Sequence, residues 1–196
     1  SADYILASDL ALNAFTRKEI RKHLQNGDVV LHHCNAGLAG SYGAHATCGI
    51  EEAYADGIDV VLASHETRPR SQGFKITIWE ALRCGLPVIA ITDGMTNATI
   101  RRYGLNKAML GVDRVAKDGS VANKIGSADA ASVFQEYGLP FHYCTSYSTI
   151  DLGTEKGEDI PIEVRNVDEF TYPYRLEAED KKRRGIISAA ALDEWP

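Results

Sequence analysis

The chain alternates short apolar runs with amphipathic segments, and this alternation restricts its fold more than any other feature. Each apolar run is nearly continuous, which is typical of strands buried on both faces of a parallel sheet. The repeat of about 25–30 residues indicates βαβ units. We therefore predict an α/β fold, with a parallel sheet covered by helices on both faces. The expected strands are residues 28–33, 59–63, 87–92, 108–112 and 140–144, and the expected helices are residues 7–25, 43–56, 72–84, 98–103 and 123–137. Beyond these, residues 159–164 read as extended chain and the charged run at 177–184 as a solvated helix face.

Composition excludes several classes of protein. The 196 residues allow one domain with a substantial core, and 44% hydrophobic with 24% charged residues is ordinary for a globular chain. A net charge of −6 argues against nucleic acid as a partner, because such interfaces need clustered Lys and Arg. No apolar run approaches the roughly 20 residues that span a bilayer, so we expect no membrane partner, and no signal-peptide pattern is visible. The cysteines lack short C-x-x-C spacing, so we expect reduced thiols and a cytoplasmic location; they are Cys34, Cys48, Cys84 and Cys144.

Polar, chemically capable residues follow the predicted strands. The carboxyl ends of parallel strands meet at one edge of the sheet, where ligands bind in open α/β folds. Cys34 follows the first strand and Asp113 directly follows the fourth. Donors suited to an anion follow the second and fourth strands; they are Arg68, Arg70, Gln72, Asn123 and Lys124. The pattern predicts an anion-binding edge that carries one acid and one thiol.

Some of these residues also have a purely structural interpretation. A cysteine at a strand end often packs as a small buried hydrophobe. Asp113 can cap the next turn or pair with Arg114. Asn123 can cap the helix expected from its own position onward. Spacing alone leaves these alternatives open.

Other kinds of site are disfavoured by spacing. His32, His33 and His65 suggest a metal, but they lack H-x-x-x-H or H-E-x-x-H spacing, so we expect no metal site. The glycine-rich segment 119–126 is neither a Walker A nor a G-x-G-x-x-G motif. The sequence also has no G-x-S-x-G elbow, which disfavours a serine hydrolase.

Five motifs in order resemble the methylthioribose-1-phosphate isomerase family, which is related to the regulatory subunits of initiation factor 2B and to ribose-1,5-bisphosphate isomerase. The motifs are HCNAG (33–37), ETRPRSQG (66–73), GVDRV (111–115), DGSVANKIG (118–126) and STID (148–151), followed by IPIE (160–163). The resemblance covers residues 8 to 165. It implies a single Rossmann-like catalytic domain over residues 1–196, without the family's N-terminal helical domain.

The resemblance also implies an activity and a set of site residues. The expected reaction converts 5-methylthioribose 1-phosphate into 5-methylthioribulose 1-phosphate in methionine salvage, and it needs no cofactor or metal. Cys34 and Asp113 match the family's catalytic pair. The residues expected to bind the substrate are Asn35, Gly37, Arg68, Gln72, Asn123 and Lys124.

The chemistry of this reaction suggests a role for each catalytic residue. Phosphate locks the anomeric carbon, so the sugar ring must open with acid assistance, and a hydrogen must then move between C1 and C2. We expect a partly desolvated Asp113 to donate the proton. We expect Cys34 to act as base, with its pKa lowered by Lys124 or an arginine. A hydride shift in a dry pocket shaped by Cys34 is the alternative chemistry.

Two other functions stay open. One is isomerisation of a different pentose 1-phosphate, such as ribose 1,5-bisphosphate or 5-deoxyribose 1-phosphate. The other is a non-catalytic regulatory role like that of the initiation factor 2B subunits, which lack the Cys–Asp pair. Ala36 stands where the family usually has Thr. As partners we expect the sugar phosphate and either a second copy in a homodimer or a companion chain that carries the N-terminal helical half.

Overall fold

The computed structural model describes residues 10–11, 14–15, 17–35, 47–145, 147–166 and 168–171. The chain falls into two compact units, one formed by residues 1–67 and 71–160 and the other by residues 68–70 and 161–196. The first unit contains the sheet and its helices. The interpretation of residues 1–196 as a single domain stays a prediction.

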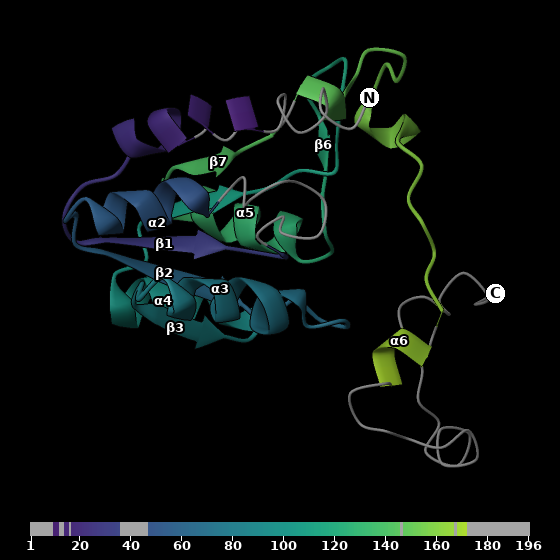
Figure 1. The fold of residues 1–196 in the computed structure, drawn as a ribbon. Helices are drawn as coiled ribbons and strands as arrows, with labels where there is room; N and C mark the ends of the chain where they lie inside the picture. The colour runs from purple at the N-terminus through teal and green to yellow at the C-terminus, as the bar shows by residue number, and fades with distance from the viewer. Residues whose placement is uncertain are drawn as a thin grey trace. The chain divides into compact units, whose positions relative to one another are not determined.

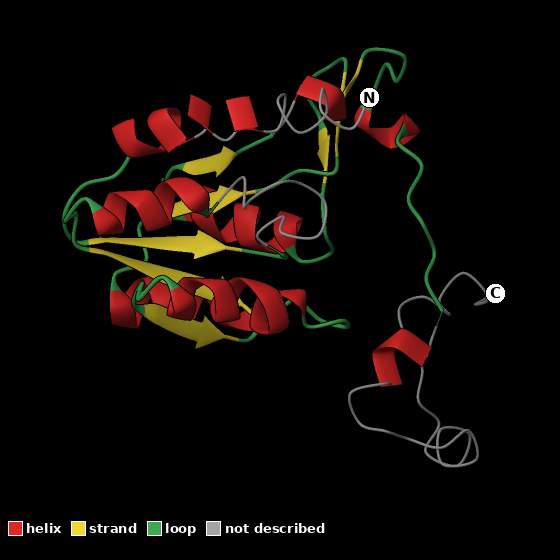
Figure 2. Ribbon diagram, viewed as in Figure 1, coloured by secondary structure: helices red, strands yellow, loops and turns green. Residues whose placement is uncertain are grey.

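Five parallel strands form the central sheet of the first unit, in the order β3-β2-β1-β4-β7 (Figures 1 and 2). Every residue of β1 is buried, as expected for a strand covered on both faces. The strands are β1 (Asp28–His32), β2 (Val60–His65), β3 (Val88–Ile91), β4 (Lys107–Leu110) and β7 (Phe141–Tyr143). Each lies within two residues of its expected range, and the predicted fold class is confirmed.

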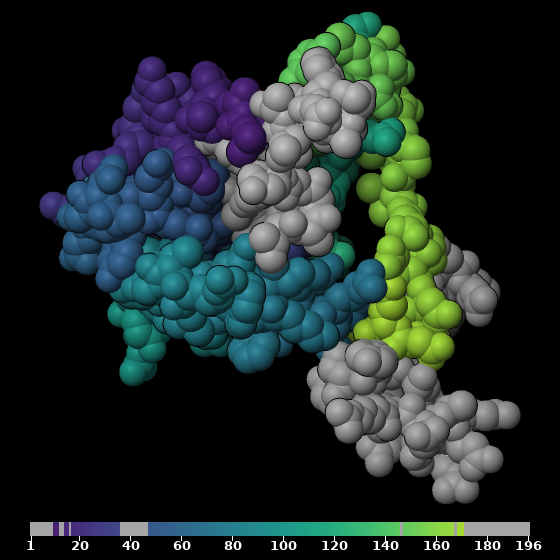
Figure 3. All heavy atoms as spheres, viewed as in Figure 1, coloured from purple at the N-terminus to yellow at the C-terminus, as the bar shows by residue number. Residues whose placement is uncertain are grey.

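Helices cover both faces of this sheet. The helical residues 17–22, α2 (Cys48–Ala55) and α3 (Ile78–Arg83) pack on one face, in a core that includes Val30. Figure 3 shows the outside of this layer, with the N-terminal helix in purple beside α2 in blue. α4 (Thr96–Tyr103) and α5 (Ser127–Glu136) pack on the other face, where Leu31 meets Phe134 in a second core. Successive residues of β1 therefore feed opposite cores, which is the alternation of a strand.

β1 and β4 are tied together at both ends. At the amino ends, Lys107 Nζ lies 2.6 Å from a carboxylate oxygen of Asp28, whose side chain is almost fully buried. At the carboxyl ends, His32 Nδ1 donates to the carbonyl oxygen of Met109 at 2.8 Å. These contacts fix the register of the two strands, and with it the position of whatever follows each strand.

A second, small sheet lies in the same unit and is absent from the sequence-based prediction. It comprises β5 (Arg114–Ala116), β6 (Val121–Ala122) and β8 (Ile150–Asp151), in the order β6-β5-β8. β5 is antiparallel to β6 and parallel to β8. Strands of two or three residues are too short to give a periodic pattern. The remaining short elements are η1 (Gly73–Thr77), η2 (Asp93–Met95), η3 (Tyr147–Thr149), η4 (Gly157–Asp159) and, in the second unit, α6 (Asp168–Thr171).

Several expected boundaries are wrong. The helix expected over residues 123–137 begins only at Ser127, because β6 occupies the chain just before it. Over residues 159–164, where extended chain is expected, η4 ends at Asp159, Ile160 has extended backbone angles, and residues 161–164 belong to no helix or strand. The charged run at 177–184 lies outside the described residues, as do the first residues of the helix expected over 43–56. None of the helices within the described residues has the length and apolar character needed to cross a membrane.

Candidate active site

The two expected catalytic residues follow the two strands at the switch point of the sheet. The chain builds β2 and β3 on one side of β1 and then returns to place β4 on the other side. Ligands of open α/β sheets bind outside the carboxyl ends of the strands at such a reversal. Cys34 follows β1, and Asp113 follows β4, its neighbour. The fold therefore brings to one edge a thiol and a carboxylate that are far apart in the sequence.

Hydrogen bonds with two threonines fix the turn at Cys34. Its backbone takes a left-handed conformation with φ of 81°, which is uncommon for a residue with a side chain. The amide N–H of Cys34 donates to Thr67 Oγ1 at 2.9 Å, and its carbonyl oxygen accepts a hydrogen bond from Thr77 Oγ1 at 2.8 Å. Asn35 Nδ2 points at the sulfur, 3.8 Å away. Strained backbone that is held this firmly is concentrated at functional sites.

The ends of three neighbouring strands are linked through Thr67. This residue also has a positive φ, of 65°, and its amide donates to Asp93 Oδ1 at 2.8 Å. Gly73 completes the arrangement, since a Cβ at this position would lie 1.8 Å from the carbonyl oxygen of His65. Glycine is required there because η1 approaches the end of β2 so closely. The ETRPRSQG segment thus holds both Cys34 and the start of η1.

Burial raises the pKa of the Cys34 thiol, and this is opposite to the expected shift. Desolvation is the largest cause, and the negative charge of Asp113 raises the pKa further. The Asn35 amide and the charge of Lys124 lower it, but by less. The expectation of a lowered pKa is therefore wrong, although the expected neighbour Lys124 does lie near enough to act on the thiol.

Asp113 is exposed, whereas partial desolvation was expected. Its amide donates to the carbonyl oxygen of Ala122 at 3.0 Å, which fixes the backbone next to β6. Arg114 pairs with Asp151 at 3.1 Å and not with Asp113, so that structural alternative is wrong. The carboxylate therefore lies open to solvent beside the half-buried thiol.

The Lys124 loop (residues 123–126) lies between β6 and α5. Asn123 Nδ2 donates to Ser127 Oγ at 2.8 Å, and Ser127 Oγ donates to the carbonyl oxygen of Lys124 at 2.7 Å. Asn123 is not the cap of the helix, because α5 begins four residues later and Gly126 precedes it. The loop is therefore held by its own contacts with the first residue of the helix.

Gln72 has a buried side-chain acceptor without a partner. Its Oε1 atom is inaccessible to solvent and has no hydrogen bond in the structure. Leaving a buried acceptor unpaired costs about 1–3 kcal/mol, so such atoms are rare in folded proteins. Gln72 directly precedes η1, whose Thr77 bonds to the Cys34 carbonyl. A ligand hydroxyl reaches this atom only if the side chain moves, so its burial does not by itself place Gln72 in the site.

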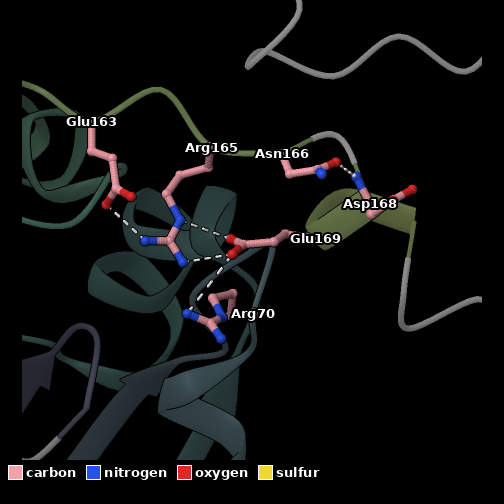
Figure 4. A network of polar contacts seen from close by, with 6 residues as sticks. All are labelled: Arg70, Glu163, Arg165, Asn166, Asp168 and Glu169. Atoms are coloured by element: carbon pink, nitrogen blue, oxygen red, sulfur yellow. Dashed lines mark hydrogen bonds and ion pairs between the residues drawn. The ribbon is translucent and has the colours of Figure 1, made fainter.

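The structure does not describe two of the expected binding residues as part of the first unit. Gly37 is outside the described residues. Arg68 belongs to the second unit, where its guanidinium donates to the carbonyl oxygen of Phe170 at 2.9 Å and lies 5.1 Å from the centre of the Phe170 ring. In the same unit, Glu169 lies 3.8 Å from Arg70 and accepts a hydrogen bond from Arg165 (Figure 4). Arg68 and Arg70, which were expected to bind an anion, therefore both have partners within this unit.

Sequence reasoning missed a buried pair of histidines beside the site. His33 and His65 are completely buried, and their Nδ1 atoms lie 2.9 Å apart. Asp93 lies with them in a group whose potential ligand atoms are within 4.8 Å of one another. Motif spacing does not reveal this group, because its members come from three strand ends. The adjacency of β1 and β2 was the signal that would have predicted it.

These features define the class of protein: a Rossmann-like α/β fold with a candidate ligand site at its switch point. A family model described as the initiation factor 2 subunit family matches residues 2–189. The chain belongs to this family.

The relatives carry two kinds of name. The methylthioribose-1-phosphate isomerase of Petrotoga mobilis is 37% identical over 90% of this chain and 51% of its own length. The methylthioribose-1-phosphate isomerase of Syntrophotalea carbinolica is 38% identical over 91% of this chain and 53% of its own length. Among solved structures, subunit delta of initiation factor eIF-2B from A. fulgidus aligns with a TM-score of 0.79, at 30% identity over 86% of this chain and 49% of that one. The 5-methylthioribose 1-phosphate isomerase from Pyrococcus horikoshii aligns with a TM-score of 0.74, at 30% identity over 86% and 46%. The chain spans about half the length of the curated relatives it matches.

Proposed function

We propose that this chain forms the catalytic half of an aldose–ketose isomerase that acts on 5-methylthioribose 1-phosphate in methionine salvage, giving 5-methylthioribulose 1-phosphate. The observation that carries the proposal is the position of Cys34 and Asp113 after neighbouring strands at the switch point, with Lys124 close enough to act on the same thiol. The names of the relatives that match most of the chain agree with this choice.

The proposed reaction moves protons between two residues and the sugar. Asp113 donates a proton to the ring oxygen as the bond between that oxygen and C1 breaks. Cys34 takes the proton from C2, which leaves an enol between C1 and C2. Cys34 then returns its proton to C1, and the C2 hydroxyl gives its proton back to Asp113 as the ketone forms. The product is an isomer of the substrate, and both residues end in their starting states.

This mechanism places a requirement on the protonation state of each catalytic residue. The raised pKa of Cys34 means that only a minor fraction is thiolate at neutral pH, so the rate should rise with pH. The mechanism also requires Asp113, whose side chain is exposed, to supply a proton to the ring oxygen.

The proposed binding residues are those that the family resemblance implies. Gln72, which directly precedes η1, is proposed to bind a sugar hydroxyl, and the ammonium of Lys124 suits the phosphate. Asn35, adjacent to Cys34, and Asn123, adjacent to Lys124, supply amide donors. We keep Gly37 and Arg68 in the proposed set on the family resemblance alone.

Thiol labelling tests whether the edge binds a sugar phosphate. The protein is alkylated with iodoacetamide, and the modified cysteines are quantified by mass spectrometry with and without methylthioribose 1-phosphate. Protection of Cys34 is expected, while the exposed Cys84 serves as internal control and keeps its labelling rate. If neither this compound nor ribose 1,5-bisphosphate changes the labelling of Cys34, the proposed enzyme site is rejected. Stronger protection by the bisphosphate would assign the chain to that substrate.

Isotope exchange separates the two chemistries. With the proton route in deuterium oxide, the ketose should gain deuterium at C1, because a thiol proton exchanges with solvent. Full retention of the substrate's C2 hydrogen, with no solvent deuterium, would indicate the hydride shift.

A second candidate function is a non-catalytic regulatory module, since the delta subunit of eIF-2B is as similar to this chain as the isomerase structure is. The Cys–Asp pair at the switch point favours the enzyme. We further propose, on the family resemblance, a homodimer or a companion chain as partner. A cytoplasmic location is proposed because no disulfide joins the four cysteines.

A further inference from the structure

A chain of hydrogen bonds runs through the two buried histidines beside the site. His33 Nε2 lies 2.8 Å from the carbonyl oxygen of Ile125, in the Lys124 loop. The Nδ1 atoms of His33 and His65 are 2.9 Å apart, and His65 Nε2 lies 3.0 Å from Thr96 Oγ1 at the start of α4. The chain thus connects the Lys124 loop, the ends of β1 and β2, and α4.

The partners dictate where each proton lies. A carbonyl oxygen only accepts, so His33 Nε2 must carry the hydrogen that it donates to Ile125. Burial lowers the pKa of both histidines, which keeps them neutral, so His33 Nδ1 is an acceptor. His65 must then donate from Nδ1, and its Nε2 accepts from the hydroxyl of Thr96. Only one proton fits between the two Nδ1 atoms.

A metal ion explains these distances less well. Two imidazole nitrogens on one tetrahedral zinc lie about 3.3 Å apart, because each Zn–N bond is about 2.0–2.1 Å. The observed 2.9 Å is a hydrogen-bond length. The third potential ligand, Asp93, already accepts the amide N–H of Thr67 at 2.8 Å.

The His33 ring is also the spacer between the thiol and the Lys124 loop. His33 immediately precedes Cys34, and its ring packs directly on Gly126 at the end of the loop. A Cβ at Gly126 would lie 3.1 Å from His33 Cε1, and Gly126 has a φ of +97° that disfavours any side chain. The loop therefore approaches β1 only as closely as this ring allows.

We propose that His33 and His65 share a single proton between their Nδ1 atoms and act as a positioning pair, which holds the Lys124 loop at a fixed distance from Cys34. The role in positioning rests on the proposed function, whereas the proton arrangement does not. The charged groups facing the pair are Asp93, which favours its protonation, and Lys124 and His32, which oppose it. A second proton would set two N–H groups against each other and break the chain.

Nitrogen NMR tests the proton arrangement without any activity. In ¹⁵N-histidine-labelled protein at pH 7, the long-range spectrum should give His33 as the Nε2–H tautomer and His65 as the Nδ1–H tautomer. An Nε2–H tautomer at His65, an imidazolium at either residue, or a shift of both rings on addition of zinc would overturn the proposal.

Kinetics tests the positioning role. His65→Leu removes the donor to His33 and should raise KM for methylthioribose 1-phosphate about tenfold, the equivalent of one hydrogen bond, with a smaller change in kcat. His65→Asn keeps an amide N–H near the Nδ1 position and should restore KM. His142→Asn, on β7, serves as matched control and should leave both constants unchanged.

The outcomes distinguish this inference from the proposed function. An unchanged KM in His65→Leu, or equal effects of Leu and Asn, would reject the positioning role even if the protein is an active isomerase. If the wild-type protein has no isomerase activity, the proposed function and the positioning role both fail, and the NMR result alone decides the proton arrangement.

Discussion

Lowering the pH from 7.5 to 4.5 is expected to cost the folded protein about 2–3 kcal/mol of stability through His65 alone. Burial lowers the pKa of His65 from its ordinary 6.5 to about 4 in the folded state. The unfolded chain therefore binds a proton near pH 6.5, while the folded protein resists it until about pH 4. Stability falls with pH across this window and levels off below it.

The magnitude follows from the difference between these two values. Within the window each pH unit costs at most about 1.4 kcal/mol per histidine, and the loss accumulates to about 2–3 kcal/mol at pH 4.5, where the folded state begins to take up the proton. Burial also lowers the pKa of His32 and His33, so these residues add to the loss in the same direction.

Urea unfolding at pH 7.5, 6.5, 5.5 and 4.5, followed by circular dichroism, measures the effect. The variant His65→Asn does not titrate in this range, so its free energy of unfolding should depend less steeply on pH than that of the wild type. The two slopes should differ by about 1 kcal/mol per pH unit between pH 6.5 and 5.5. Equal slopes would refute the argument, since they would mean that His65 takes up its proton equally in both states.

Three further predictions concern the thiol, the unpaired acceptor and the core. Because burial raises its pKa, Cys34 should react with iodoacetamide at a rate that still rises above pH 9, whereas a plateau near pH 8 would contradict the desolvation. Gln72→Leu removes a buried unpaired acceptor, so thermal stability should stay equal or rise while affinity for the sugar phosphate falls about tenfold; parallel losses of both would assign Gln72 a structural role. Phe134→Ala, at a fully buried side chain under the sheet, should lower the free energy of unfolding in urea by about 3–5 kcal/mol, and a loss below 1 kcal/mol would contradict the packing described for the second core.

The main sheet was predictable because its strands are buried on both faces, which makes them continuous apolar runs. The small sheet was not, because β6 and β8 have two residues each and their pairing depends on tertiary contacts. The start of α5 was misplaced for a related reason. Asn123 is a good capping residue, but it follows β6, and the positive φ of Gly126 sets the start of the helix instead.

The position of the site was predictable, but its electrostatics were not. Cys34 and Asp113 were placed at the carboxyl edge from their positions after apolar runs. The threonines that hold Cys34 are 33 and 43 residues away in the sequence, so no local pattern reveals them. The direction of the thiol's pKa shift depends on whether desolvation, which raises the pKa, outweighs groups such as the nearby Lys124 ammonium, which lower it. That balance exists only in the folded protein.

Turnover of methylthioribose 1-phosphate by the wild-type protein and by two variants tests the central claim most directly. The wild type should produce the ketose, and Cys34→Ser and Asp113→Asn should each lower kcat by about 10²–10⁴-fold, the range for loss of an acid or base. The matched controls Cys84→Ser and Asp129→Asn, at exposed positions, should keep wild-type rates. Wild-type turnover in either Cys34→Ser or Asp113→Asn would contradict the account, as would a wild-type protein whose Cys34 is protected by the substrate but which forms no ketose.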